Sequence, residues 1–89
     1  MTLEPQIRFN NTTNRHNTVL EVEAEDRPGL LNEISSELTS RGCNIEVAMI
    51  ATHGRKAVDV FYVTFGGSKL DAEQQELLQN ALLHRISAA

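Results

Sequence analysis

Residues 18–42, TVLEVEAEDRPGLLNEISSELTSRG, contain two hydrophobic patterns of different period, separated by one turn. In 18–25, apolar residues alternate with glutamates, and this period of two predicts a strand with one solvated face. Beyond the turn, leucine and isoleucine recur at helical spacing, with polar residues opposite them. The pattern predicts a helix over 28–41, with Pro28 at its first position and Gly42 as its stop. A strand that leads into a helix in this way is the first half of a β-α-β unit.

The next part of the chain predicts a β-hairpin. Residues 44–52 and 57–65 are rich in β-branched and aromatic side chains, and a turn with Gly54 separates them. Both strands carry apolar residues on both faces: on the first, Ile45, Val47 and Met49 alternate with Ala48 and Ile50. Apolar residues on a sheet face without helices favour a partner surface, most economically a second copy of this chain. The alternative is that a few surface apolar residues are tolerated there.

The two ends of the chain supply the remaining elements. Two glycines break the chain after the hairpin, and Asp71 with Gln74 three residues later resembles a capping box. A second amphipathic helix is predicted over about 71–87. Near the N-terminus, a short alternation of apolar and polar residues predicts an edge strand within 6–10, followed by a polar turn cluster.

These elements predict a ferredoxin-like α+β sandwich. It has a four-stranded antiparallel sheet with two helices on one face, and a right-handed β-α-β crossover. The N-terminal strand takes the place that the last strand holds in the usual βαββαβ order. The expected order across the sheet is 44–52, 57–65, 18–25 and 6–10. We take 1–17 as an N-terminal extension and 18–89 as the domain proper.

Composition limits the classes of function. The 89 residues allow one domain, and eight basic against twelve acidic residues give a net charge of −4, which argues against nucleic-acid binding. No apolar run approaches the roughly 20 residues of a membrane helix. The single cysteine excludes an internal disulfide and a multi-cysteine metal site, and it favours a cytoplasmic location. The three histidines lack metal-ligand spacing and no catalytic motif is present, so we expect binding, without a metal, a cofactor or catalytic residues.

The turn between the first long strand and the first helix is the candidate binding site. Free N–H groups and the helix dipole suit a carboxylate there, and Gly29 lets a ligand approach the backbone closely. Asp26 could pair with an ammonium group of the same ligand. An anion site beside a carboxylate fits a zwitterion, which is a free amino acid. The alternative is that Asp26 only caps the helix and Gly29 only permits tight packing.

Several stretches resemble a known family. The string DRPGLLNEISSELTSRGCNI resembles the signature of ACT domains, which are small regulatory modules that bind amino acids. Together with TVLEVEAEDRPGLL and IATHGRKAVDVFYVT, the chain resembles the C-terminal ACT domain of bacterial PII-protein uridylyltransferase/uridylyl-removing enzymes over nearly its whole length. That family often has aspartate where Phe65 follows Val-Thr here, so the resemblance does not extend to the loop over 64–69.

The resemblance implies a glutamine sensor that reports to catalytic domains, either in the same chain or in a separate enzyme. ACT ligand sites use backbone N–H groups of this turn and an asparagine at the start of the next strand, often across a dimer interface. The positions that correspond are Asp26 for the amine or the loop shape, Gly29, Leu30 and Leu31 for the carboxylate, Asn44 and Ile45 for polar and backbone contacts, and Asn32 as a weaker candidate. The competing interpretation is an oligomerisation or interaction module that binds no ligand.

Two other residues stand out. Cys43 is expected to pack as a small apolar group where it enters its strand. Asp59 interrupts an otherwise apolar strand, and it could pair with Arg55 or Lys56 or mark an interface. The sequence does not decide between these roles.

Overall fold

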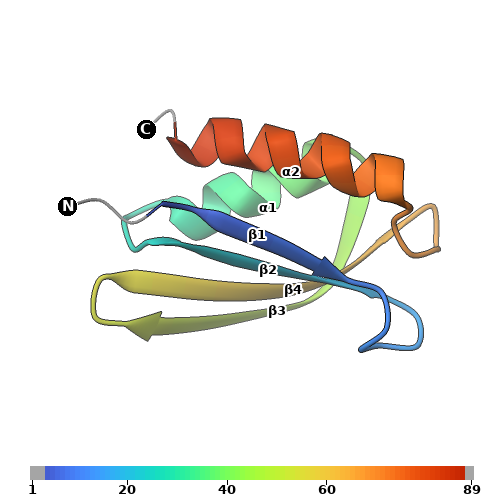
Figure 1. Ribbon diagram of the computed structural model, residues 1–89, viewed down its shortest axis with the longest axis horizontal. Coiled ribbons are helices and arrows are strands. Elements are labelled where there is room, and N and C mark those ends of the chain that lie inside the picture. The colour runs from blue at the N-terminus through green and yellow to red at the C-terminus, as the bar shows by residue number, and fades with distance from the viewer. Residues whose placement is uncertain (1–3, 88–89) are drawn as a thin grey trace.

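The computed structural model describes residues 4–87, so the first three residues of the expected extension and the last two of the expected domain lie outside it. Figure 1 shows the described chain as a sheet with two helices packed on one side of it. The elements are β1 (Gln6–Asn10), β2 (Thr18–Glu25), α1 (Leu30–Ser40), β3 (Cys43–His53), β4 (Lys56–Phe65) and α2 (Ala72–Ser87).

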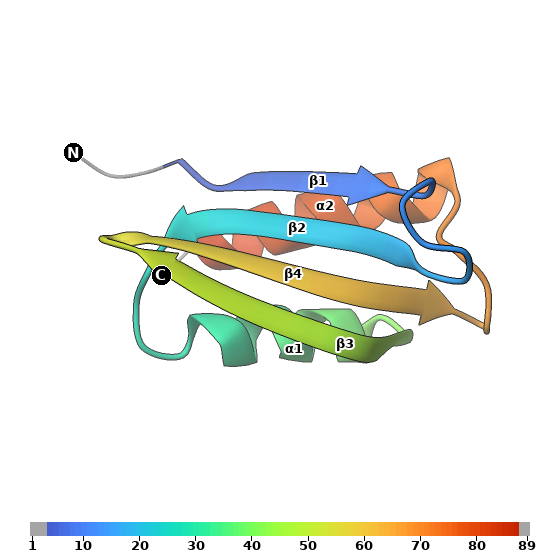
Figure 2. The same ribbon diagram turned by 90° about the horizontal axis from the view of Figure 1, so that it is seen from below.

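The sheet has the order β1-β2-β4-β3, as predicted from the connections. Each neighbouring pair is antiparallel, so β2 and β3 run parallel with β4 between them. The register of β2 on β4 runs from Thr18 opposite Val63 to Glu25 opposite Lys56. Both helices lie behind the same face of the sheet in Figure 2, which confirms the ferredoxin-like architecture.

The start of α1 differs from the prediction. Pro28 lies in a turn rather than in the helix, and Gly29 is the N-cap residue, with φ of 82°. A left-handed residue cannot belong to a right-handed helix, so α1 begins only at Leu30. The alternative role of Asp26 as a cap of α1 is excluded, because no side chain among the described residues caps α1 and Asp26 lies three residues before the N-cap. At the other end, Gly42 has φ of 87° just after the helix, as expected of a helix stop.

The start of α2 confirms the predicted capping box. The N–H of Gln74 donates to Oδ1 of Asp71 at 2.8 Å, and the N–H of Asp71 donates to Oε1 of Gln74 at 2.9 Å. The two residues therefore satisfy each other's backbone donors before the helix begins at Ala72.

The core fills the space between the sheet and the helices. Its fully buried side chains are mainly leucine, isoleucine, valine and one phenylalanine: Leu20, Val22, Ile34, Leu38, Phe61, Val63, Leu70 and Leu82. Cys43 is buried at the edge of this cluster, in agreement with the packing role expected for it. On α2, the side chain of Leu77 is 58% exposed. No helix within residues 4–87 is long and apolar enough to span a bilayer.

A β-bulge changes the faces of β3. Ile45 pairs with Val63 but Val47 pairs with Tyr62, so Glu46 is the extra residue. The prediction that Ile45, Val47 and Met49 share one face is therefore wrong. Ile45 packs against the core, whereas the opposite, helix-free face receives Val47 and Met49.

Candidate functional site

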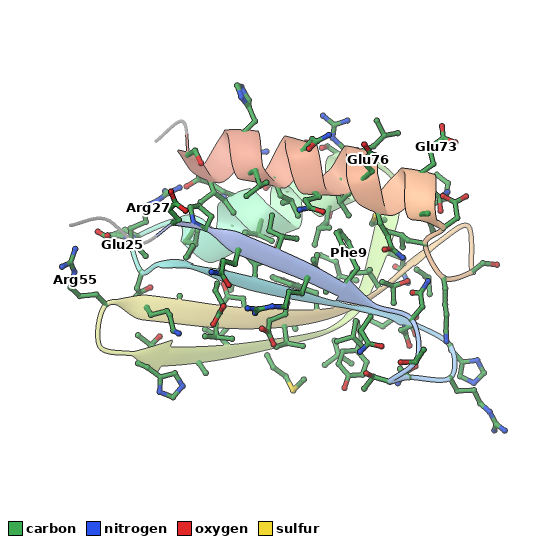
Figure 3. The ribbon with its side chains drawn as sticks, in the orientation of Figure 1. Phe9, Glu25, Arg27, Arg55, Glu73 and Glu76 are labelled. Carbon is green, nitrogen blue, oxygen red and sulfur yellow. The ribbon has the colours of Figure 1, made fainter. Side chains whose placement is uncertain are left out.

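The turn between β2 and α1 lies at the end of the sheet where the β3–β4 hairpin also closes, near the side chains of Glu25, Arg27 and Arg55 in Figure 3. The N–H of Asp26 donates to the carbonyl of Arg55 at 2.7 Å, which fixes the turn to the hairpin. At Gly29, no heavy atom lies within 4 Å of the position that a β-carbon would take. The turn is thus anchored where it begins and open where it meets the helix.

The first turn of α1 has backbone N–H groups without acceptors. The N–H of Leu30 donates to the carbonyl of Arg27 at 3.2 Å, and that of Glu33 donates to Gly29 at 2.9 Å. Within the described residues, the N–H groups of Leu31 and Asn32 have no corresponding acceptor and no side-chain cap. Such groups carry the partial positive charge of the helix dipole, so this end of α1 can receive a carboxylate.

Arg27 holds the turn in place. Its guanidinium donates to both carboxylate oxygens of Glu33, and Nη2 also donates to the carbonyl of Ile86 in α2 at 3.4 Å. The hydrogen bond to Glu33 raises the pKa of Arg27, and the same contact lowers the pKa of the Glu33 carboxyl below its ordinary value. Arg27 therefore joins the turn to the first turn of α1 and the last turn of α2.

The structure brings five of the predicted site residues to this end of the sheet. Asp26, Gly29, Leu31 and Asn32 are exposed on the turn and the first turn of α1. The side chain of Leu30 is 3% exposed and belongs to the core, so only its backbone is available to a ligand.

The other two predicted residues, Asn44 and Ile45, lie at the opposite end of the sheet. Asn44 pairs with Thr64 on β4, whereas the turn follows Glu25, which pairs with Lys56. The length of β4 between these two pairs is roughly 26 Å. A single chain therefore does not bring Asn44 and the β2–α1 turn together.

Asp59 is a charged residue at the turn's end of the sheet whose role the sequence left open. It sits between Val22 and Ile50 on the helix-covered face, 2% exposed, and its Oδ1 has no hydrogen-bond partner among residues 4–87. Burial raises the pKa of the Asp59 carboxyl, and the nearby charge of Asp26 raises it further.

The basic residues expected near Asp59 have acidic partners elsewhere. Arg55 pairs with Glu25 at 3.2 Å, and Lys56 pairs with Glu23 at 3.3 Å. Both partners lie on β2, and Glu23 lies on the face of the sheet opposite to Asp59. Asp59 thus shares its surroundings with a second carboxylate, that of Asp26.

A cavity of about 430 Å³ lies between the last turn of α1 and the first turns of α2, away from the β2–α1 turn. Its lining includes Arg41, Cys43, Phe65 and the exposed Leu77, and none of the predicted ligand-binding residues. Burial raises the pKa of the Cys43 thiol, which makes it a poor nucleophile. Among residues 4–87, no three histidine, cysteine or acidic side chains are grouped to hold a metal ion.

A family model described as the ACT domain matches residues 18–79. The chain is 40% identical over 88 residues to the bifunctional uridylyltransferase/uridylyl-removing enzyme of Bradyrhizobium sp. (strain ORS 278). It is 39% identical over 87 residues to the enzyme of the same name from Gluconobacter oxydans, and 37% identical over 87 residues to that from Rhodopseudomonas palustris. These alignments cover 96–97% of this chain but only 9–10% of each relative, so the chain spans about a tenth of their length.

Proposed function

The chain belongs to the ACT-domain family, and we propose that it is a regulatory domain that senses glutamine at the β2–α1 turn. The observation that carries the proposal is the open N-terminus of α1, where the N–H groups of Leu31 and Asn32 have no acceptor in the part of the chain that the structure describes, beside the unobstructed Gly29. A ligand carboxylate fits these donors. Asp26, which is exposed next to them, fits the ligand ammonium.

The similarity to uridylyltransferase/uridylyl-removing enzymes supports a regulatory role. The matched segment is a small part of those enzymes and corresponds to an ACT domain. We propose that the chain reports glutamine to catalytic domains, either in the same polypeptide or in an enzyme that it contacts in trans.

A second copy of the chain is the proposed partner, and β3 is the proposed contact. This strand has 11 residues and lies at an edge of the sheet, with Val47, Met49 and Ile50 between 43% and 57% exposed. A long apolar edge strand is a template for pairing with another strand. Antiparallel pairing of two β3 strands would join the two sheets into one of eight strands.

Such a dimer would complete the binding site. In an antiparallel β3–β3 pair, the start of one strand lies beside the end of the other. The end of β3 leads through the hairpin to Arg55, which holds Asp26. Asn44 of the partner subunit would then lie near the β2–α1 turn, although the two are at opposite ends of a single subunit.

The regulatory signal follows from this arrangement. A ligand held between two subunits binds the associated state more tightly than the separated one, so it shifts the equilibrium toward association. Coupling of this kind requires a difference in affinity between the two states and no change in the fold of each subunit.

Isothermal titration calorimetry of the 89-residue chain with L-glutamine tests the proposal, with L-glutamate and L-asparagine as comparisons. Gly29→Ala is the informative variant and Gly67→Ala is its control, because both glycines have φ near 80° and open space at the β-carbon position. Both variants should lose about 1 kcal/mol of stability from the same backbone strain. Only Gly29→Ala should weaken glutamine binding. If the original chain binds no amino acid at millimolar concentration, the sensor proposal is wrong.

The exposed edge of β3 favours a second candidate function, an oligomerisation module that binds no ligand. It predicts the same dimer, with a dissociation constant that is equal with and without glutamine. Sedimentation velocity measures this constant. Ile50→Lys should then dissociate the dimer to the same extent with and without added glutamine.

A further inference from the structure

We propose that Asp59 accepts the ammonium group of the amino-acid ligand, so that two carboxylates, those of Asp26 and Asp59, select for a free amine. The inference rests on the proposed function, because it names a further contact of the same site. It assigns a ligand-recognition role to a residue on the sheet rather than on the turn.

The Asp59 carboxylate has an unsatisfied oxygen among the described residues. Asp59 is 2% exposed, and its Oδ1 is the buried side-chain oxygen that lacks a hydrogen-bond partner within residues 4–87. Buried polar groups in folded proteins are nearly always paired, and an unpaired one requires an explanation. An ammonium group, with three N–H donors and a positive charge, would satisfy both the hydrogen-bonding capacity and the charge of this oxygen.

The charge that acts on Asp59 from its surroundings is negative. The charge of Asp26 acts on Asp59, while the ion pairs of the neighbouring basic residues are formed with Glu23 and Glu25 on β2. Two carboxylates that repel each other are stabilised by a cation bound between them. In a zwitterionic amino acid, one carbon atom separates that cation from the carboxylate, so the open N-terminus of α1 can hold the other end of the ligand.

The helix side of β3 is partly exposed near Asp59. Ile50, which pairs with Asp59 across the sheet, is 57% exposed, and Thr52 further along β3 is also exposed. The helix side of β3 is therefore not fully covered beside Asp59, and apart from its chain neighbours no described heavy atom lies within 4 Å of the β-carbon position of Gly29. Because Asp59 itself is almost fully buried, the amine reaches its carboxylate only when the side chains over it move aside.

The test compares two ligands on two variants of the 89-residue chain. The ligands are L-glutamine and 4-carbamoylbutanoate, which has the same carboxylate and amide but no α-amino group. Asp59→Asn keeps the shape of the side chain and removes its charge. It should weaken L-glutamine binding roughly 10- to 100-fold and leave the affinity for the analogue unchanged. Asp71→Asn makes the same chemical change at the start of α2, where asparagine also caps, and should change neither affinity.

Each result has one meaning. If the original chain binds neither ligand, the proposed function fails and the assignment of Asp59 fails with it. If the original chain binds L-glutamine and Asp59→Asn binds it equally well, only the assignment of Asp59 is overturned. If Asp59→Asn weakens the binding of both ligands equally, the assignment is also overturned. A carboxylate that only supports the fold would affect a ligand with an α-amino group and one without it to the same extent. Thermal melting of both variants verifies that they are folded.

Discussion

The two helices of this domain begin in opposite ways. At α2, Asp71 and Gln74 satisfy each other's backbone donors in a capping box. At α1, the N-cap residue is Gly29, and within residues 4–87 no side chain caps the helix and the N–H groups of Leu31 and Asn32 lack acceptors. The open end of α1 forgoes a cap worth a few tenths to about 1 kcal/mol. The same chain can close a helix end, so the open end of α1 is a property of one particular turn and calls for a functional explanation.

The largest expected effect comes from closing the open end. Gly29→Asp places a carboxylate where the ligand carboxylate is proposed to bind, and aspartate tolerates a left-handed backbone better than most residues. We expect the affinity for glutamine, measured by calorimetry, to fall roughly 10- to 100-fold, because the side chain competes for the same N–H groups.

Gly67→Asp is the control for this variant, since Gly67 has nearly the same φ and lies in the loop between β4 and α2. Its affinity for glutamine should equal that of the original chain. Unchanged affinity in Gly29→Asp would mean that the ligand carboxylate is held elsewhere.

Removing the cap at the start of α2 is the reverse change. It should have a smaller effect, which is measured as stability rather than as affinity. Asp71→Ala removes the acceptor of the Gln74 N–H, and we expect a loss of about 1 kcal/mol in the free energy of unfolding. In a domain of this size, that loss lowers the melting temperature by about 4–8 °C. Glutamine affinity should not change, because α2 is not part of the proposed site. A drop in affinity as large as that of Gly29→Asp would remove the distinction between the two helix ends.

The order of elements could be predicted from the sequence because each carries a clear period. The alternating glutamates fix the solvated face of β2, and the capping box fixes the start of α2. The end of α1 was also predictable, since Gly42 adopts a left-handed conformation and a β-carbon there would lie 3.0 Å from the Phe65 ring. In these places, local chemistry and tertiary structure favour the same conformation.

The start of α1 and the faces of β3 could not be predicted from local sequence preferences. Proline is favoured at the first position of a helix, but Gly29 after it adopts a left-handed conformation, so the turn continued to Leu30. The bulge at Glu46 has no signal in the β-branched run around it, and it moved Val47 to the helix-free face. A single extra residue reverses every later side chain of a strand, and for this reason the faces of β3 were predicted incorrectly.

The site was predictable only in part. A glycine and an acidic residue beside a helix start could be recognised, and the structure places them together. The separation of Asn44 from the turn follows from the parallel β2 and β3, because the end of one strand and the start of the other lie at opposite ends of the sheet. The effect of the Asp26 charge on the Asp59 carboxyl was not predictable, since it depends on the tertiary position of the β2–α1 turn.

The smallest expected effect concerns the charge beside the open end of α1. The pKa of Asp59 is raised by burial and by Asp26, so the folded chain binds this proton more tightly than the unfolded chain does. The free energy of unfolding therefore falls as the pH rises from the unfolded value of about 3.9 through the folded pKa, and it stays lower above that. Asparagine does not titrate, so Asp59→Asn should be more stable than the original chain at neutral pH.

The expected gain is a few tenths to about 1 kcal/mol, because asparagine removes the charge but leaves a buried polar group. Urea unfolding at pH 7 and pH 4 measures it, and the difference between the two chains should shrink at the lower pH. The matched Asp71→Asn change at the capped end should give no gain at pH 7. A variant that gains stability and loses affinity for an amine would mark Asp59 as a residue kept for binding at the expense of the fold. Equal or lower stability of Asp59→Asn at neutral pH would show instead that the carboxylate is already satisfied in the unliganded chain.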